Sequence, residues 1–403
     1  MIATIEGDRI LLPGLATAHS HAFQRALRAR TQRGRGSFWS WRGLMYELAA
    51  TMGPDDLYAL SRFAFVELAC SGVTAVGEFH YVHHQSDGAP YADRNELAHA
   101  VTRAALDAGL RITLLRVIYQ RPGLGRAVEG AQRRFFDPDV ERALADVDDF
   151  AARWKDEPRV RAGVAPHSVR AATLEAIEAA SRFARERAMP LHMHVAEQRR
   201  EVQECMAEHG RRPVELLAER GVLDSRFVAV HATHLASPEV EALARAPSFV
   251  CLCRTTERDL GDGLPPLSAL VRHGARLCFG ADSHASSDPF EEARAAELDE
   301  RSRTERRCAA ADGEALLAAA TREGYAAIGM AGLETEDRVL LDRTRPELAG
   351  APEGLADDAV IFAASARSVD EVWVAGARVV EGGRHARYEE ARLAYEAALR
   401  RLV

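Results

Sequence analysis

Short runs of apolar residues alternate along the chain with longer stretches that have helical periodicity. The apolar runs lack regular polar alternation, which is typical of parallel strands covered on both faces. Among the stretches between them, residues 54–72 have Pro near the start and Gly at the end, which are start and stop signals of helices. The predicted strands lie at residues 11–22, 72–81, 111–120, 160–169, 190–197, 227–235, 248–256 and 276–285. Eight such units favour an α/β fold of the (β/α)8 TIM-type barrel class; an open doubly wound sheet is the alternative, because strand number does not establish closure.

The pattern changes near residue 335. Short strand candidates follow at residues 337–342, 358–364, 371–380 and 381–388, and a helical pattern fills residues 388–403. We therefore expect three parts. They are a short N-terminal strand of a β appendage at residues 1–12, the barrel at 13–334, and a small β-sandwich-like appendage with a closing helix at 335–403.

The composition narrows the class of protein. Of the 403 residues, 47% are hydrophobic, which provides enough apolar material for a core and excludes general disorder. The 52 Lys and Arg against 60 Asp and Glu give a formal charge of −8, which argues against nucleic acid as a partner. No apolar segment reaches the roughly 18 residues of a membrane span, and the first residues lack the layout of a secretory signal. Six cysteines in so long a chain do not indicate a disulfide scaffold, so we expect a globular, cytoplasmic protein.

Polar side chains gather at the C-terminal ends of the predicted strands. In a (β/α)8 barrel these ends surround one cavity, where the chemistry takes place. We therefore expect the following residues around one cavity: His19, His21, His80, His167, His194, His231, Thr255 and Asp282.

His19 and His21 are the strongest local signal for a metal site. Residues i and i+2 of a strand point to the same side, so both imidazoles can reach one ion. Two histidines on one strand are by themselves more often structural than metal-binding. Three further polar residues at other strand ends make a metal site the favoured interpretation: His194, His231 and Asp282. Imidazole and carboxylate are ligands that zinc commonly takes, with one position left open for water in catalytic sites.

Neighbouring residues compete for these places. His192 shares a strand face with His194, but the spacing from His194 to Glu197 favours His194 as the ligand. His234 is a rival to His231, although it lies further into its loop. Cys251 and Cys253 could be soft metal ligands, but buried core positions are the simpler interpretation.

Several longer motifs carry a resemblance to a known family. They are PGLATAHSHAFQRALR, SFWSWRGLMY, GVTAVGEFHYVHH, APHSVRA, LHMHVAEQ, VHATHL, CLCRTTERDLGDGLPPL and GADSHASSDPFEEAR, which span most of residues 13 to 294. The sequence resembles the amidohydrolase superfamily and, within it, the formimidoylglutamate deiminases of bacterial histidine degradation. The HSH and ADS segments are common to the superfamily, whereas SFWSWR, EFHYVHH and TTERDLGDG are far more specific.

The resemblance implies an activity and a site. The activity is zinc-dependent hydrolysis of N-formimidoyl-L-glutamate to N-formyl-L-glutamate and ammonia by a homodimer with one zinc ion per subunit. The implied metal ligands are His19, His21, His194 and Asp282. Among the implied catalytic residues, Glu197 shuttles protons, His231 orients the attacking water and Asp282 accepts its proton.

The resemblance also implies how the two carboxylates of the substrate are bound. An acidic protein needs local cations for a dicarboxylate, and the planar fork of arginine matches carboxylate geometry. The implied substrate-binding residues are Gln24, Arg42, Tyr81, His167 and Arg170. We expect no nucleic acid or membrane partner.

Two other functions stay open. Another deaminase of the superfamily would act on an aminopurine or aminopyrimidine, with an aromatic-lined pocket and little dependence on Arg42 or Arg170. A barrel relative without catalysis would serve as a binding or assembly protein, with an eroded set of ligands. Two features depart from the family pattern: the short segment ahead of His19, which could weaken the appendage or the dimer, and Arg254, which stands where the family has proline.

Overall fold

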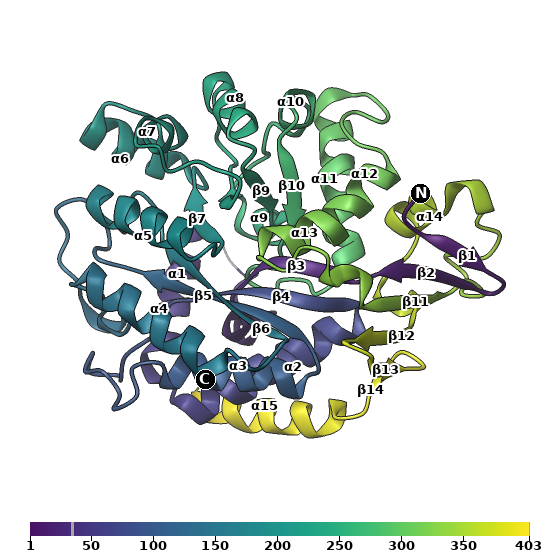
Figure 1. Cartoon of the computed structure of the whole chain (residues 1–403), viewed down its shortest axis with the longest axis horizontal. Coiled ribbons are helices and arrows are strands. Elements are labelled where there is room, and N and C mark those ends of the chain that lie inside the picture. Colours follow the sequence, from purple (N-terminus) through teal and green to yellow (C-terminus); the bar gives the residue numbers. More distant parts are fainter. Residues whose placement is uncertain (34–35, 403) are drawn as a thin grey trace.

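The structure is a computed structural model that describes residues 1–33 and 36–402. Eight parallel strands form the central sheet, and their order in space follows their order in the chain. They are β3 (Leu15–Ser20), β4 (Val73–His80), β5 (Arg111–Ile118), β6 (Val160–Pro166), β7 (Leu191–Val195), β8 (Phe227–His231), β9 (Phe249–Leu252) and β10 (Arg276–Phe279). All eight predicted strands are present, and the predicted barrel class is confirmed (Figure 1).

Backbone hydrogen bonds between the end of β3 and the segment after β10 close the barrel at one end. Ser20 of β3 forms a parallel bridge with Asp282, just beyond the end of β10. The N–H of Asp282 donates to the carbonyl of His19 at 3.0 Å, and the N–H of His21 donates to the carbonyl of Asp282 at 2.8 Å. The closure therefore brings His19, His21 and Asp282 together from distant parts of the sequence.

Helices surround the barrel, and several begin at capping side chains that the sequence supplies. Asp139 accepts two N–H groups at the start of α4, and Asp288 does the same for α11. The helices are α1 (Phe38–Thr51), α2 (Pro54–Cys70), α3 (Glu96–Asp107), α4 (Val140–Trp154), α5 (Leu174–Glu186), α6 (Arg199–His209), α7 (Pro213–Glu219), α8 (Ser237–Arg245), α9 (Arg254–Leu260), α10 (Leu267–His273), α11 (Pro289–Thr304), α12 (Gly313–Ala318), α13 (Gly324–Ala327), α14 (Ala356–Phe362) and α15 (Tyr388–Leu402). Short 3₁₀ helices span Ala22–Leu27, Gly130–Arg134, Leu333–Thr335, Glu353–Leu355 and Ala366–Ser368, and a π-helical turn spans Ala319–Glu323. Among the described residues, no helix has the length and apolar character needed to cross a membrane.

A second sheet, at the right of Figure 1, is built from both ends of the chain. It is antiparallel and six-stranded, in the order β1 (Thr4–Glu6), β2 (Arg9–Pro13), β11 (Arg338–Asp342), β12 (Val369–Val374), β13 (Ala377–Glu381) and β14 (Arg384–His385). Helix α15 continues from this sheet and packs along α2 of the barrel. The appendage is thus connected to the barrel by the chain from β2 to β3 and by the packing of α15 on α2.

One predicted strand of the appendage is wrong. Residues 358–364 were expected to be extended, but α14 occupies most of this segment. A short apolar run fits a buried strand and a buried helix equally well, and only length and surroundings separate them. Here Val360 and Ile361 are buried on one side of a helix, and Asp357 accepts the N–H groups of Ile2 and Ala3.

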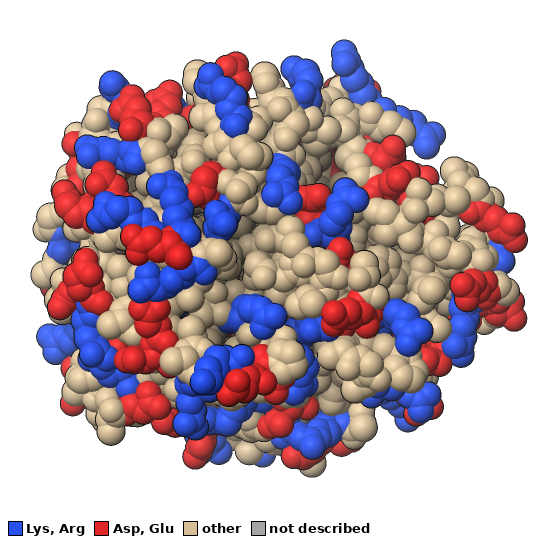
Figure 2. Space-filling view, viewed as in Figure 1, with Lys and Arg blue, Asp and Glu red and all other residues tan. Residues whose placement is uncertain are grey.

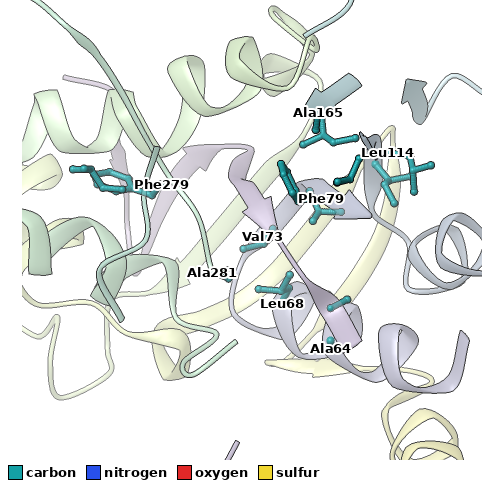
Figure 3. Packing of buried hydrophobic residues seen from close by; sticks show 14 of the residues in the cluster. Ala64, Leu68, Val73, Phe79, Leu114, Ala165, Phe279 and Ala281 are labelled. Carbon is teal, nitrogen blue, oxygen red and sulfur yellow. The ribbon is translucent and has the colours of Figure 1, made fainter. Parts of the chain in front are cut away.

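One contiguous apolar cluster fills the space between strands and helices (Figure 3). It includes Phe79 of β4, Leu114 of β5 and Ala165 of β6, together with Ala64 and Leu68 of α2. Each of these side chains is at most 1% exposed. The barrel strands are thus covered from inside and outside, which explains why they read as continuous apolar runs.

Candidate active site

The strand ends at one mouth of the barrel have unusual backbone conformations. The residues with positive φ, between 46° and 70°, are Ala196 after β7, His231 and Ala232 at the end of β8, and Asp282 and His284 after β10. Non-glycine residues seldom adopt this conformation, and it is concentrated at functional sites. The chain turns sharply at these points, and the side chains of His231 and Asp282 line the central cavity.

Four donor atoms converge at this mouth. Nε2 of His19 lies 3.2 Å from Nε2 of His21 and 3.1 Å from Nε2 of His194. Oδ1 of Asp282 lies 3.5 Å from Nε2 of His19 and 3.4 Å from Nε2 of His21. A tetrahedral zinc ion with bonds of about 2.0–2.1 Å requires ligand atoms roughly 3.3 Å apart. All four side chains are buried, and their spacing fits a single divalent metal ion.

The protonation of the three histidines also fits a metal. Nδ1 of His21 donates to the carbonyl of Phe79 at 2.9 Å, and Nδ1 of His194 donates to the carbonyl of His167 at 3.2 Å. These bonds leave the Nε2 lone pairs of His21 and His194 directed at the centre of the four-residue cluster, where a metal ion would lie. Burial lowers the pKa of His19 to about 3 and, with the neighbouring histidines, holds the pKa of His194 well below its usual value. Neutral imidazoles are the form that binds metal.

Glu197 and His231 lie beside this cluster. Nε2 of His231 is 3.9 Å from Oε1 of Glu197 and 3.7 Å from Oδ2 of Asp282. Burial raises the pKa of Glu197. Burial alone would lower the pKa of His231, but the carboxylates of Glu197, Glu257 and Asp282 outweigh it and raise the pKa to about 10. The arrangement therefore provides a cationic imidazole next to a carboxyl group of raised pKa.

A cavity with about 570 Å³ of free space, part of it open to solvent, lies over these groups. Every residue that the sequence predicted to bind substrate lines it: Gln24, Arg42, Tyr81, His167 and Arg170. The amide of Gln24 donates to the hydroxyl of Tyr81 at 2.8 Å. The remaining wall is largely apolar and aromatic, formed by Phe38, Trp41, Met45, Tyr46, Tyr119, Phe135 and Leu260.

The two cavity arginines create a site for an anion. The guanidinium of Arg42 stacks on Trp39 at 4.5 Å and lies 5.4 Å from the ring of Tyr46. Burial, together with repulsion from Arg170, lowers the pKa of Arg42. One buried nitrogen of Arg42, Nη1, has no hydrogen-bond partner among the described residues. Two neighbouring cations with a free donor are suited to a carboxylate.

Sequence reasoning missed Tyr119. Its hydroxyl is buried without a hydrogen-bond partner in the described part of the chain, and its ring lines the cavity near Arg42 and Arg170. The available signal was its position at the end of the third predicted strand. A tyrosine in an apolar run was not distinguished from an ordinary core residue.

Two residues expected around the cavity do not line it. His80 is buried next to His83, with ring centroids 5.3 Å apart, and does not reach the cavity. It follows Phe79 and precedes Tyr81, so strand alternation turns it to the opposite side. Thr255 is also turned away, because its N–H and its hydroxyl both donate to Glu292 of α11.

The competing metal ligands lie elsewhere. Nε2 of His192 is hydrogen-bonded to the carbonyl of Ala327 at 2.9 Å, so His192 faces the barrel interior away from the four-residue cluster. Cys251 is part of a buried core cluster. Cys253 belongs to the same cluster, although it also lies with His231 and Asp282 in a group whose potential ligand atoms are within 4.8 Å of one another. That smaller group shares Asp282 with the cluster of three histidines.

Comparisons with known proteins identify the family. A family model described as "Amidohydrolase family" matches residues 10–379. The chain belongs to the amidohydrolase family. It is therefore a hydrolase of carbon–nitrogen bonds of the amidohydrolase type, and the recognition made from its motifs is confirmed.

Three similar proteins illustrate the relationship. A formimidoylglutamate deiminase of Pseudomonas aeruginosa is 38% identical over 98% of this chain and 89% of its own length. A 5-methylthioadenosine/S-adenosylhomocysteine deaminase of Shouchella clausii is 29% identical over 97% of this chain and 86% of its own length. The crystal structure of an amidohydrolase from Brucella melitensis has a TM-score of 0.91 and 35% identity, and covers 99% of this chain and 95% of that one.

Proposed function

We propose that this amidohydrolase-type deaminase hydrolyses N-formimidoyl-L-glutamate to N-formyl-L-glutamate and ammonia, with one zinc ion. The observation that carries the proposal is that one cavity contains both the four-residue metal cluster and two arginines, Arg42 and Arg170. The metal cluster suits hydrolysis of an amidine, and the arginines suit a substrate with two carboxylates. The relative from Pseudomonas aeruginosa, a formimidoylglutamate deiminase, supports the choice.

The proposed metal ligands are His19, His21, His194 and Asp282. When bound there, zinc supplies the Lewis acidity that makes a water molecule a competent nucleophile near neutral pH. The near-tetrahedral spacing of the donor atoms and the neutral state of the imidazoles support this assignment.

Two side chains then divide the proton transfers, and a third stabilises charge. Asp282 takes a proton from the attacking water, whose oxygen bonds to the formimidoyl carbon. In the tetrahedral adduct formed from the amidinium group, Glu197, whose pKa is raised, delivers a proton to the terminal NH2 group. The bond from carbon to that nitrogen then breaks to release ammonia, and the added hydroxyl gives its proton to Glu197 as it becomes the carbonyl oxygen of N-formyl-L-glutamate. The proton on Asp282 passes to ammonia or solvent. His231 lies within 4 Å of both carboxylates and, as a cation, stabilises the negative charge that develops at the reacting centre.

Recognition of the substrate is assigned to the outer part of the cavity. Arg42 and Arg170 bind carboxylate groups, and Tyr81 with Gln24 provides a hydrogen-bonded pair beside His21. His167 connects the metal cluster with the outer part of the cavity, because its carbonyl accepts Nδ1 of the metal ligand His194 while its ring lines the cavity.

A second candidate function is deamination of an aminopurine or aminopyrimidine. The aromatic wall of the cavity, including Trp41, Tyr46 and Phe135, favours it, and so does the Shouchella clausii relative. A planar ring would stack on this wall and would not need two arginines. A non-catalytic barrel relative is disfavoured, because all four ligands and both acid–base carboxylates are present.

An ammonia-release assay separates these functions. The zinc-loaded chain is offered N-formimidoyl-L-glutamate and, in parallel, a panel of aminopurines and aminopyrimidines, and the metal content of the same preparation is measured. We expect ammonia from the formimidoyl compound alone and about one zinc ion per chain. Release of ammonia from a ring substrate, with none from N-formimidoyl-L-glutamate, would favour the second function instead.

The broader setting is also a prediction. We propose that the enzyme acts in histidine degradation, in the cytoplasm and as a homodimer. Size-exclusion chromatography with light scattering tests the homodimer, which should elute with twice the mass of the 44.1 kDa chain.

A further inference from the structure

A buried carboxylate lies directly behind His231. Glu257 of α9 is fully buried and does not line the cavity. Its Oε1 atom lies 3.2 Å from Nδ1 of His231, the ring nitrogen opposite the one that faces Glu197 and Asp282. Both oxygens of Glu257 accept hydrogen bonds from other donors, so Nδ1 of His231 is taken as the donor in this contact.

Both oxygens of Glu257 are held by other donors. The N–H of Cys253 donates to Oε1 at 3.0 Å, and Nη1 of Arg254 donates to Oε2. Arg254 is itself 1% exposed, and its Nη2 donates to Asp299 of α11 at 2.7 Å. The carboxylate is therefore fixed by the start of its own helix, α9, and Arg254 connects it to Asp299 of α11.

His231 needs such a support. Its backbone has a φ of 70°, and Ala232 after it has a φ of 51°, so the strand has already turned away at this residue. The contact with Glu257 is the hydrogen bond of Nδ1, and it fixes the rotation of the ring. With the ring fixed, Nε2 lies 3.9 Å from Glu197 and 3.7 Å from Asp282.

We propose that Glu257 is a positioning residue that keeps Nδ1 of His231 as a donor and thereby presents Nε2 to the reacting centre, with Arg254 holding Glu257 in place. The inference rests on the role of His231 in the proposed function. Outer carboxylates that orient histidines in metal sites typically affect activity 10- to 100-fold. Arg254, which stands where the family has proline, is thus assigned the role of holding Glu257, and its position in the sequence alone did not indicate this.

The kinetic test uses Glu257→Gln in the zinc-loaded, full-length enzyme. The amide of Gln is nearly isosteric, but it must turn its NH2 group toward either Arg254 or the N–H of Cys253, where a donor meets a donor. We expect kcat to fall about 10- to 100-fold, KM to change less than about twofold, and the zinc content to stay the same. Glu257→Asp, which withdraws the carboxylate by one methylene, should give a similar loss.

Glu239→Gln is the matched control. Glu239 is also fully buried, accepts Nε of Arg212 at 2.6 Å and the N–H of Val214 at 3.0 Å, and does not line the cavity. We expect this variant to keep the kcat, KM and zinc content of the unmodified enzyme. The comparison separates loss of a buried arginine–glutamate pair from loss of the contact with His231.

A measurement without substrate makes the test independent of the reaction. Proton NMR of the zinc-loaded enzyme should show a low-field N–H resonance that is absent in His231→Asn. This resonance should be lost or shifted in Glu257→Gln and Glu257→Asp, and unchanged in Glu239→Gln. An unchanged resonance, an unaffected kcat, or a loss of zinc that accounts for the loss of activity would overturn the inference. If a ring compound replaces N-formimidoyl-L-glutamate as substrate, the proposed function fails while the resonance still decides the role of Glu257.

Discussion

Glu197 and Asp282 are two carboxylic acids in one cavity, and their surroundings move their pKa values in opposite directions. Burial raises the pKa of Glu197. Burial would also raise the pKa of Asp282, but His19, His21 and His231 outweigh it and hold that pKa below its usual value. Two acids with separated pKa values can act as proton donor and proton acceptor in the same reaction.

The role of Glu197 is tested by Glu197→Gln. Gln has nearly the same shape but carries no transferable proton, so we expect kcat to fall by at least about 100-fold. Zinc binding should be retained, because Glu197 is not one of the four ligands. Steady-state ammonia release and elemental analysis of the same sample check both statements. Near-normal ammonia release would remove Glu197 from the mechanism.

The role of Arg170 is tested by Arg170→Met. Met keeps much of the apolar length but removes the charge, and a hydrogen bond to a charged group contributes about 1.5–3 kcal/mol. We expect kcat/KM for N-formimidoyl-L-glutamate to fall about 10- to 100-fold, mainly through KM. The control is Arg121→Met, because Arg121 pairs with Glu208 and does not line the cavity. Equal KM values for the Arg170 variant and the unmodified enzyme would contradict the recognition argument.

At the scale of elements, carboxyl groups on the helices after the barrel strands hold the turns next to the cavity. Glu201 in α6 accepts the N–H groups of Ala196 and Glu197 at 3.1 and 3.2 Å, and so holds the turn that carries Glu197. Glu292 of α11 accepts the N–H of Thr255 at 3.1 Å and its hydroxyl, and so holds the start of α9. Buried carboxylates therefore connect the helices to the loops of the mouth.

Glu292 gives a prediction about pH and stability. Burial raises its pKa to about 8, although the hydrogen bonds from Thr255 oppose the shift. The folded chain then keeps a proton on Glu292 up to pH of about 8, whereas the unfolded chain releases it near pH 4.3. The unfolded state thus binds fewer protons in this interval, and the contribution of Glu292 to stability is lost as the pH rises from about 4.3 toward 8.

The variant Glu292→Gln has no such proton to release. We expect its free energy of unfolding to decline less than that of the unmodified protein between pH 5 and pH of about 8. Urea unfolding at several pH values, followed by circular dichroism, measures the difference. Parallel curves for the two proteins would show that Glu292 is ionised in the folded state at neutral pH.

At the scale of the whole molecule, a buried ionic cluster attaches the appendage to the barrel. Asp337 is fully buried and accepts Nε of Arg111 at 2.8 Å, the hydroxyl of Tyr325 at 2.5 Å and the N–H of Ala375 at 2.8 Å. Arg111 starts β5 of the barrel, whereas Ala375 lies between β12 and β13 of the appendage. One carboxylate therefore joins the two sheets.

The contribution of Asp337 is tested by Asp337→Ala. Removing Asp337 leaves the buried guanidinium of Arg111 with only the exposed carboxylate of Glu336 as a partner, and breaking a buried pair in this way costs up to about 3–5 kcal/mol. The control is Glu219→Ala, because Glu219 pairs with Arg211 at the surface, where both side chains are about half exposed and the pair contributes less than about 1 kcal/mol. Denaturant unfolding of both variants at equal zinc content measures these costs. A similar loss in the two variants would contradict the attachment argument.

Charge over the whole molecule is mixed. On the face shown in Figure 2, basic and acidic side chains are interspersed. The formal charge of −8 therefore does not describe the cavity, where Arg42 and Arg170 are the charged residues of the outer wall. A local pair of cations is enough to attract an anionic substrate to an acidic protein.

The appendage shows where sequence patterns stop being informative. The apolar run around Val360 and Ile361 predicted a strand and became a helix, because such a run fits either element. The barrel strands could be predicted, since burial on both faces leaves a continuous apolar run that recurs eight times. Their closure could not, because it depends on backbone bonds between β3 and the segment after β10.

The sequence by itself determined the eight strand–helix units and the resemblance to the family, because strand periodicity and strand-end motifs such as that of His19 and His21 are local properties. Only the tertiary structure decided which polar residues share the cavity. His80 is turned away from the cavity that its neighbour Tyr81 lines, because adjacent residues of a strand point to opposite sides. Tyr119 carried no motif, and Glu257, although it lies in the motif TTERDLGDG, carried no local sign of its contact with His231; the importance of both residues comes from what lies next to them in space. Contacts between distant segments fix side-chain direction and pKa, and no local pattern contains them.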